Sequence, residues 1–163
     1  MVMHEEADTV VSSHLAGTIL LRPEIVMPVL PHFTTIRELV PLLFVEDITR
    51  AAEFYRHQLG FEFREKWEPQ GKLAWCRLER AGVAIMLQQA EAEDGPAEHR
   101  GHGVGLFFNC DDADVLHSEL TQRGLLIDHP KVAFYGMKQV FLLDPDGYEL
   151  CFQSPVRPSG DAE

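Results

Sequence analysis

The same succession of hydrophobic segments occurs twice in this chain. Each time, a short apolar run is followed by a stretch of helical period and then by three runs with the composition or alternation of β-strands. The first copy covers residues 38–90 and the second residues 104–154, and the period of about 65 residues aligns Val40 with Gly105. Solenoid repeats are shorter than this, so the pattern predicts two tandem β-α-β-β-β modules and an α+β fold.

The first module is predicted to begin with a buried strand and a capped helix. Asp47 is a candidate N-cap for this helix, and Gly60 is a candidate residue to end it. The predicted elements are, in order, a strand at 39–45, a helix at 48–60, and strands at 61–67, 73–79 and 83–89.

The second module repeats this order. Asp111 or Asp112 is expected to cap its helix, and Val115, Leu116 and Leu120 are expected to face the core. The predicted elements are a strand at 104–110, a helix at 112–124, a strand at 125–136 that is broken at Pro130, a strand and turn at 138–147, and a closing strand at 148–154.

Three segments lie outside the modules. Residues 1–37 are an N-terminal appendage in which prolines exclude a continuous helix, residues 91–103 are a polar linker, and residues 155–163 are a C-terminal tail. The appendage could pack on the domain, pack on a partner subunit, or result from a start codon placed too early. We expect the two modules to curl mixed sheets around a cavity between them, which is a natural place for a ligand.

Composition narrows the classes of partner. The chain has 163 residues and a formal net charge of −12, which disfavours a nucleic acid and favours a cationic ligand, although acidic surfaces also serve solubility. The sequence has no apolar run long enough to span a membrane and no basic segment typical of a signal peptide. Cys76, Cys110 and Cys151 are far apart and form no CxxC pair, so we expect a reducing, cytoplasmic location.

Three segments resemble one known family. VEDITRAAEFYRHQLGF (45–61), FFNCDDADVLHSELTQRG (107–124) and YGMKQVFLLDPDGYELCF (135–152) are similar to the signatures of the glyoxalase/bleomycin-resistance/dioxygenase superfamily, which has the vicinal-oxygen-chelate fold. The second module resembles the bleomycin-resistance branch most. The resemblance implies a homodimer, because modules in this family often pair between chains. The exposed strand edges of two half-sheets give a physical motive for such pairing.

The resemblance also implies where a metal would be bound. Enzymes of the superfamily hold a divalent metal with His, Glu or Gln from strands one, four, five and eight. The corresponding residues here are Val40, Met86, Gly105 (or Leu106 if the register shifts by one) and Cys151. None is a hard nitrogen or oxygen ligand, so we expect no metal and no cofactor. A displaced site built from Glu149 and a loop histidine, His99 or His102, is the alternative.

Strand alternation predicts which side chains line the cavity. The set is mostly apolar and aromatic with one acid and a few amides, which suits an aromatic or cationic compound. The competing interpretation is that these side chains only fill space. The candidates are Phe44, Trp67, Trp75, Met86, Gln88, Phe107, Asn109, Glu149 and Cys151.

Three functions therefore remain open. The first is a metal-free protein of the bleomycin-resistance type that sequesters a small molecule. The second is a metal-dependent lyase, isomerase or oxygenase with displaced ligands. The third is a structural or regulatory domain whose cavity is filled by its own side chains and whose appendage binds a partner.

Overall fold

The structure, a computed structural model, describes residues 35–95 and 99–157, and the described residues from Glu38 onwards belong to one compact unit. Most of the predicted appendage lies outside the described residues. The elements are β1 (Leu42–Val45), α1 (Ile48–Glu53), η1 (Phe54–Gln58), β2 (Glu62–Trp67), η2 (Pro69–Gly71), β3 (Trp75–Arg80), β4 (Val83–Gln89), η3 (Ala92–Asp94), β5 (Gly105–Asn109), α2 (Ala113–Gln122), β6 (Lys131–Val132), β7 (Met137–Leu143) and β8 (Glu149–Pro155).

These elements form two four-stranded sheets of the same topology. Sheet A has the order β1-β4-β3-β2 and sheet B the order β5-β8-β7-β6. In each sheet the first and last strands of the module pair in parallel, and the other pairs are antiparallel. The predicted α+β fold with two tandem modules and mixed sheets is confirmed. The sheets are separate and are not closed on each other, so the enclosed cavity stays a prediction.

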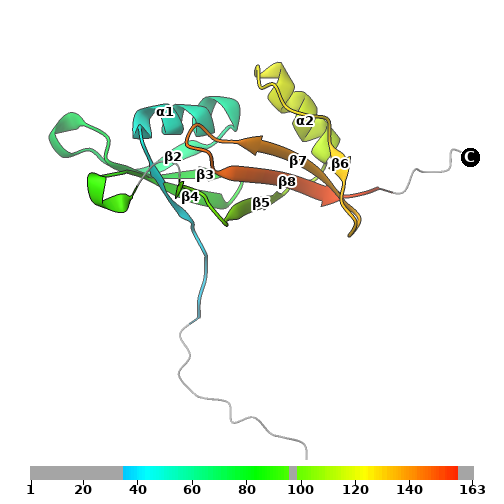
Figure 1. Ribbon diagram of the computed structural model, residues 1–163, viewed down its shortest axis with the longest axis horizontal. Coiled ribbons are helices and arrows are strands. Elements are labelled where there is room, and N and C mark those ends of the chain that lie inside the picture. Colours follow the sequence, from blue (N-terminus) through cyan, green and yellow to red (C-terminus); the bar gives the residue numbers. More distant parts are fainter. Residues whose placement is uncertain (1–34, 96–98, 158–163) are drawn as a thin grey trace, which may run out of the picture. The chain divides into compact units, whose positions relative to one another are not determined.

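The helices cover one side of the sheets, and Figure 1 shows α1 and α2 on the same side. Alternation along each strand places every second side chain under a helix. In β1, Leu43 and Val45 are buried while Leu42 is exposed, and in α1 the buried positions include Ile48 and Ala51. The core that results is continuous across both modules. Asp47 and Asp112 cap the two helices by accepting backbone N–H bonds, as the sequence predicts.

The helix expected at 48–60 is present as α1 and η1, and it changes at Phe54 to π-helical geometry. Two local predictions were wrong. Val115 is 65% exposed, because the buried face of α2 is set by Ala113, Leu116 and Leu120, and Val115 lies off that face. The strand expected at 125–136 is reduced to the two residues of β6, since residues 125–130 form no regular ladder before Pro130, which has no N–H to donate.

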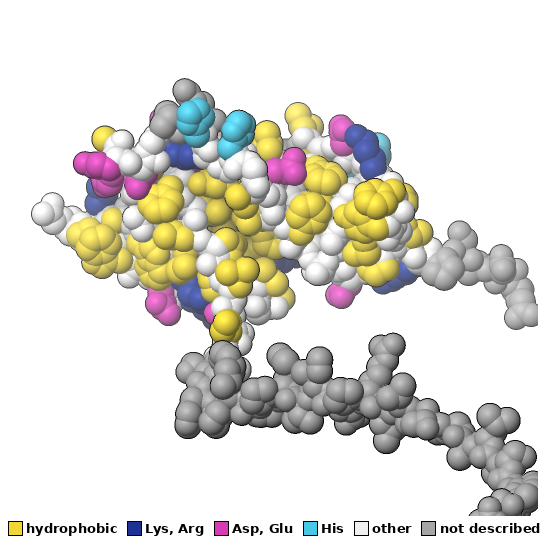
Figure 2. All heavy atoms as spheres, turned by 60° about the horizontal axis from the view of Figure 1, so that its bottom comes forward, with side chains coloured by type: hydrophobic (Ala, Val, Ile, Leu, Met, Phe, Trp, Pro, Cys, Tyr) yellow, Lys and Arg dark blue, Asp and Glu magenta, His cyan; other side chains and the backbone are white. Residues whose placement is uncertain are grey.

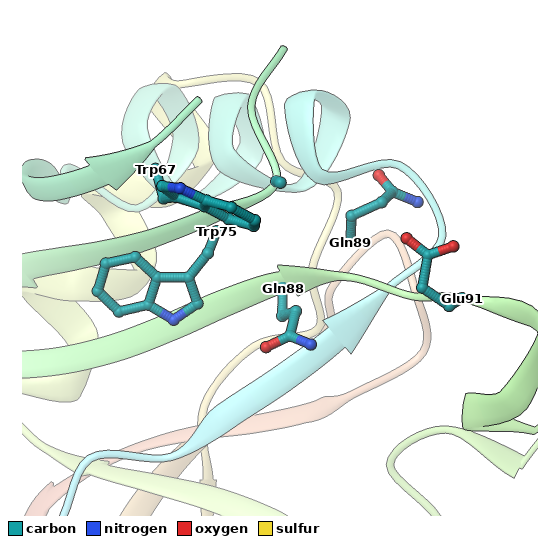
Figure 3. A pocket seen from close by; sticks show the side chains of 6 residues that line it. Trp67, Trp75, Gln88, Gln89 and Glu91 are labelled. Carbon is teal, nitrogen blue, oxygen red and sulfur yellow. The ribbon is translucent and has the colours of Figure 1, made fainter. Parts of the chain in front are cut away.

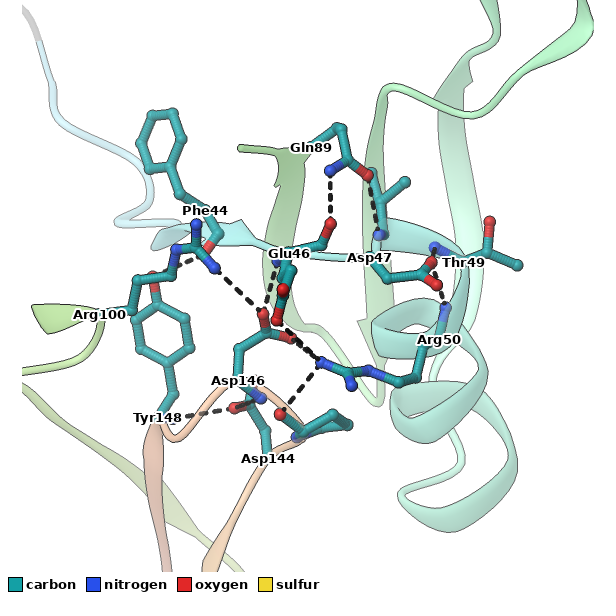
Figure 4. Close-up of polar contacts among 12 residues, drawn as sticks. Phe44, Glu46, Asp47, Thr49, Arg50, Gln89, Arg100, Asp144, Asp146 and Tyr148 are labelled. Atoms are coloured by element: carbon teal, nitrogen blue, oxygen red, sulfur yellow. Dashed lines mark hydrogen bonds and ion pairs between the residues drawn. The ribbon is translucent and has the colours of Figure 1, made fainter. Parts of the chain in front are cut away.

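The turn at residues 144–147 joins the second module to the first, as Figure 4 shows. The side chain of Asp146 accepts a hydrogen bond from the backbone N–H of Glu46 and lies 3.6 Å from the guanidinium of Arg50 and 3.7 Å from that of Arg100. The hydroxyl of Tyr148 donates to the carbonyl of Phe44 at 3.0 Å. A turn that the sequence indicates only as a tight hairpin therefore also fixes the two modules together.

Candidate ligand-binding surface

The face of sheet A that is turned away from α1 carries four of the predicted cavity residues. Phe44 pairs with Gln88 across β1 and β4, and Gln88 in turn pairs with Trp75 across β3 and β4. Met86 lies two residues from Gln88 on the same strand, so its side chain shares that face. All four side chains are half-buried. Figure 2 shows that hydrophobic side chains gather over much of the side of the molecule that lies at the bottom of Figure 1.

An open hollow of about 400 Å³ lies where β2 and β4 end and β3 begins. Trp67 is directly opposite Trp75, and its side chain is 60% exposed. Figure 3 shows the two indoles at one end of the hollow and the side chains of Gln89 and Glu91 at the other. The lining residues are Trp67, Ala74, Trp75, Gln88, Gln89 and Glu91.

Sequence reasoning missed Gln89 and Glu91 at this hollow. Gln89 donates from Nε2 to the carbonyl of Glu46 at 2.6 Å and accepts from the backbone N–H of Ile48, so it connects β4 to the start of α1. Glu91 was assigned to the polar linker, but it begins the short η3 turn, where it forms a reciprocal cap with Asp94. A Glu followed after three residues by an acid is the signal that could have placed it in a turn beside the sheet.

The corresponding face of sheet B carries the remaining predicted residues. Gly105 pairs with Glu149 and Phe107 with Cys151 across β5 and β8. The ring of Phe107 meets that of Phe141 edge to face, with centroids 6.5 Å apart. Cys151 is fully buried although it lies on this face. Burial, and then the nearby carboxylate of Glu149, raise the pKa of the Cys151 thiol to about 11, so the thiol is neutral near pH 7.

Side-chain amides and a phenol form a hydrogen-bonded row beside these rings. Nε2 of Gln139 donates to the hydroxyl of Tyr135 and, at 3.1 Å, to Oε1 of Gln153. The Tyr135 hydroxyl donates to the same oxygen of Gln153 at 3.1 Å, and Nε2 of Gln153 donates to Oδ1 of Asn109 at 3.1 Å. Strand alternation predicted Asn109 and Gln153 on this face, but it did not predict Gln139 and Tyr135, which belong to β7 and to the turn before it.

The residues at the superfamily's metal positions do not fit a divalent metal. Met86 is on sheet A, while Gly105 and Cys151 are on sheet B, and together with Val40 they offer one thioether and one buried neutral thiol. In residues 35–95 and 99–157, no group of three or more His, Cys, Asp or Glu side chains is placed to hold a metal ion. His99 and His102 are exposed, with their rings stacked 6.3 Å apart.

The predicted cavity residues thus fall into two groups. Trp67, Trp75 and Gln88 meet in the hollow of sheet A, and Phe107, Asn109, Glu149 and Cys151 lie together on sheet B. Phe44 and Met86 share a face with the first group but lie outside the lining of its hollow.

Comparison with known proteins gives one family and many similar structures. The sequence profile of the Glyoxalase/Bleomycin resistance protein/Dioxygenase superfamily matches residues 30–152. No protein with a curated description matches the chain. None of the helices in the described ranges is long and apolar enough to cross a membrane.

Solved structures share the fold at low sequence identity. The antibiotic-binding protein TnmS3 from Streptomyces sp. CB03234 is 24% identical, with a TM-score of 0.60 over 76% of this chain and 100% of its own. A glyoxalase/bleomycin resistance protein from the same organism is 25% identical, with a TM-score of 0.55 over 71% and 97%. A bleomycin-binding protein in complex with bleomycin is 19% identical, with a TM-score of 0.60 over 74% and 100%.

Proposed function

Since the chain belongs to the glyoxalase/bleomycin resistance protein/dioxygenase superfamily, we propose that it is a binding protein that captures an aromatic or cationic small molecule without a metal. The observation that carries this proposal is the pairing of Trp67 with Trp75 at a hollow that also contains the carboxylate of Glu91. A volume of about 400 Å³ lies within the range of small-molecule sites.

The chemistry of the hollow favours a flat ligand with positive charge. Indole rings offer large apolar faces for stacking, and their quadrupole attracts cations. The carboxylate of Glu91 adds a direct charge, and the net charge of −12 attracts a cation at longer range. Similar structures include a bleomycin-binding and an antibiotic-binding protein, which supports capture as the function in preference to chemistry.

The residues at the metal positions support the same choice. A Lewis acid at this place in the fold needs three or four hard ligands, and the side chains of Val40, Met86 and Cys151 supply none. We therefore place binding ahead of a lyase, isomerase or oxygenase reaction.

The proposal includes a homodimer in the cytoplasm. Large hydrophobic side chains such as Phe107, Phe141 and Leu143 are exposed on sheet B, and a second copy would cover them. The three cysteines are all free thiols, which suits a reducing compartment. Light scattering on the full chain tests the dimer, since a mass of one chain at micromolar concentration would refute it.

Tryptophan fluorescence tests the function directly, because Trp67 and Trp75 are the only two tryptophans of the sequence. We expect bleomycin, or the flat cationic dye acriflavine, to change the emission in a saturable way with one equivalent per chain. Replacing Trp75 with Leu should weaken binding about tenfold or more, measured by calorimetry. Val115→Ala, on the exposed side of α2, is the control and should bind as the wild type does.

Two outcomes would overturn the proposal. If neither probe changes the emission or the melting temperature, capture of such compounds is refuted. If elemental mass spectrometry of untagged protein finds about one equivalent of a transition metal, the metal-dependent enzyme becomes the better hypothesis.

A further inference from the structure

We propose that the outer edge of β7 in sheet B binds an extended, basic segment of a partner protein, which adds to the sheet as a further strand. The site consists of backbone N–H and C=O groups of Phe141 and Leu143, which point out of the edge of the sheet and not towards its helix-free face. The edge site is independent of the capture of a small molecule, because it involves no residue of the tryptophan hollow.

The edge of β7 is paired only in part. On one side, β8 pairs with β7 along the whole length of Met137–Leu143. On the other side, the two residues of β6 pair only with Lys138 and Gln139. The stretch Val140–Leu143 therefore has no neighbouring strand on its outer side in residues 35–95 and 99–157.

The hydrogen bonds of the β7–β8 hairpin determine which residues point outwards. The N–H of Asp144 donates to the carbonyl of Tyr148 at 3.0 Å, so Asp144 and every second residue before it direct their backbone groups to β8. Phe141 and Leu143 belong to the other set, and their N–H and C=O groups point out of the edge. No described residue forms a backbone hydrogen bond with these outward groups. Donors and acceptors that recur at every second residue are what an added β-strand pairs with.

The segment before β6 cannot close this edge in the register of β6. Continued pairing would place His129 opposite Phe141 and Ile127 opposite Leu143. Residues opposite each other in an antiparallel pair share a face of the sheet, and here that face is the helix-free one. Ile127 instead packs against the core, and the ring of His129 lies 5.1 Å from that of His117 on α2. The segment is thus held on the helix side, and a hollow of about 410 Å³ is lined both by it and by β7.

The outer edge of sheet A is protected in a way that β7 is not. β2 has six residues, and its charged residues are Glu62, Arg64, Glu65 and Lys66. Its pairing with β3 is also irregular between Phe63 and Glu65. Charges and bulges on an edge strand oppose the addition of a further strand. The stretch Val140–Leu143 has no charged residue and no irregularity in its pairing with β8, so its edge remains open to a strand.

The surroundings of the edge indicate the chemistry of the partner. Residues of an added strand that lie opposite Phe141 and Leu143 share a face with these exposed apolar side chains, so they should be apolar. Asp128 and Lys131 line the hollow but form an ion pair with each other at 2.9 Å, so they favour neither sign of charge. The net charge of −12 then favours a partner with basic flanks. We therefore expect a segment in which apolar residues alternate with other residues between basic ends.

Calorimetry of the full chain with synthetic peptides tests this edge. The first probe is a short blocked peptide in which valine and threonine alternate between two terminal lysines. Valines opposite Phe141 and Leu143 point their N–H groups at β7, so N-methylation of the valines should weaken binding about tenfold or more. N-methylation of the threonines should change it less than about twofold, because their N–H groups point away from β7. Equal effects of the two modifications would overturn strand addition.

Charge is tested by a second probe in which glutamates replace the terminal lysines. It should bind about tenfold more weakly than the first probe, because the chain is acidic. Equal or tighter binding of the glutamate probe would overturn a basic partner.

A pair of variants at one position separates the backbone from the side chain. Leu143→Pro removes the outward N–H and leaves the ladder with β8 intact, which is the arrangement that an edge strand tolerates. It should weaken the first probe about tenfold, while Leu143→Ala keeps the N–H and should weaken it less than about threefold. Equal losses would mean that the probe binds the side chain and would overturn the proposal. If the melting temperature shows that Leu143→Pro does not fold, the N-methylated peptides give the answer with the unaltered chain.

Two further outcomes separate the edge from the other proposed contacts. Trp75→Leu should leave binding of the first probe unchanged, and a loss as large as that of Leu143→Pro would place the peptide at the tryptophan hollow and refute the edge site. If light scattering shows that Leu143→Pro turns a dimer into a monomer while the first probe does not bind the wild type, a second copy occupies the edge and the partner segment is refuted.

Discussion

The hydroxyl of Tyr55 donates a 3.0 Å hydrogen bond to Oδ2 of Asp144, a buried contact between residues 89 positions apart. Tyr55 is fully buried in the first module, and Asp144 begins the turn of the second. Oδ1 of Asp144 accepts the backbone N–H groups of Asp146 and Tyr148, so both oxygens of this carboxyl are used. Burial raises the pKa of Asp144, and the bonds that it accepts counteract part of this rise.

Tyr55→Phe should therefore destabilise the protein by about 1–3 kcal/mol, since it leaves a buried carboxylate oxygen without its donor. Urea unfolding measures this value. Tyr135→Phe is the control, because that hydroxyl belongs to an exposed residue, and it should cost less than about 1 kcal/mol. Equal costs for the two variants would contradict a special role of the buried bond.

Arg80→Met should cost more than Arg64→Met. Arg80 donates to the carbonyl of Leu59 at 2.7 Å and to the carboxylate of Glu119 on α2, and its side chain is 33% exposed. Arg64 forms only a 3.5 Å ion pair with Glu79 and is 55% exposed. We expect about 1–3 kcal/mol for the first variant and less than about 1 kcal/mol for the second, both from urea unfolding. The opposite order would show that Arg80 does not help to join the modules.

Gly101→Ala should destabilise the protein more than Gly103→Ala. Both glycines have positive φ, 71° and 75°, so backbone strain should destabilise each alanine variant by a similar amount of about 1 kcal/mol. A Cβ on Gly101 would also come within 2.9 Å of Tyr148 Cδ1 and 3.1 Å of its Cα, while a Cβ on Gly103 meets nothing within 4 Å. We expect a further cost of about 1–3 kcal/mol at Gly101, seen as a lower melting temperature. Equal melting temperatures would mean that the loop moves away from Tyr148 freely.

Stability should fall as the pH rises from about 9 towards 11. Burial raises the pKa of the Cys76 and Cys151 thiols from 9.0 to about 11 in the folded chain. As the pH rises, the thiols of the unfolded chain therefore lose their protons before those of the folded chain. The contribution of the two thiols to the free energy of unfolding is complete below pH 9 and is lost as the pH approaches 11. Urea unfolding at several pH values should give a shallower decline for the double variant Cys76→Ala/Cys151→Ala. Parallel curves would show that the two thiols do not titrate differently in the two states.

Much of the fold could be predicted from local patterns. Alternation in β1, β4, β5 and β8 identifies the buried face of each strand, and Asp47 and Asp112 are N-caps by a purely local rule. Val115 and the segment at 125–130 were misjudged, because apolar character alone does not fix the phase of a helix or guarantee a pairing partner.

Less of the candidate site could be predicted, because its contacts join distant segments. Alternation places Phe107, Asn109 and Glu149 on one face, but no period relates Gln139 or Tyr135 to Asn109. The place of Glu91 at the hollow was not predicted, because Glu91 lies in a polar stretch and composition alone does not distinguish a linker from the rim of a hollow. The contact between the 144–147 turn and Tyr55 depends on how the two modules pack, and this packing cannot be predicted from the pattern of either module alone.

The contacts made by Arg80 and Asp144 are reciprocal. Arg80 ends β3 of the first module and reaches Glu119 on the helix of the second, while Asp144 follows β7 and reaches Tyr55 in η1, which continues the helix of the first module. The β3–β4 hairpin thus contacts the helix of the second module, and the β7–β8 hairpin contacts the helical segment of the first. A chimera that takes one half from a relative therefore changes one side of both contacts at once, and it should fold well only when the relative's half supplies partners for Arg80 and Asp144.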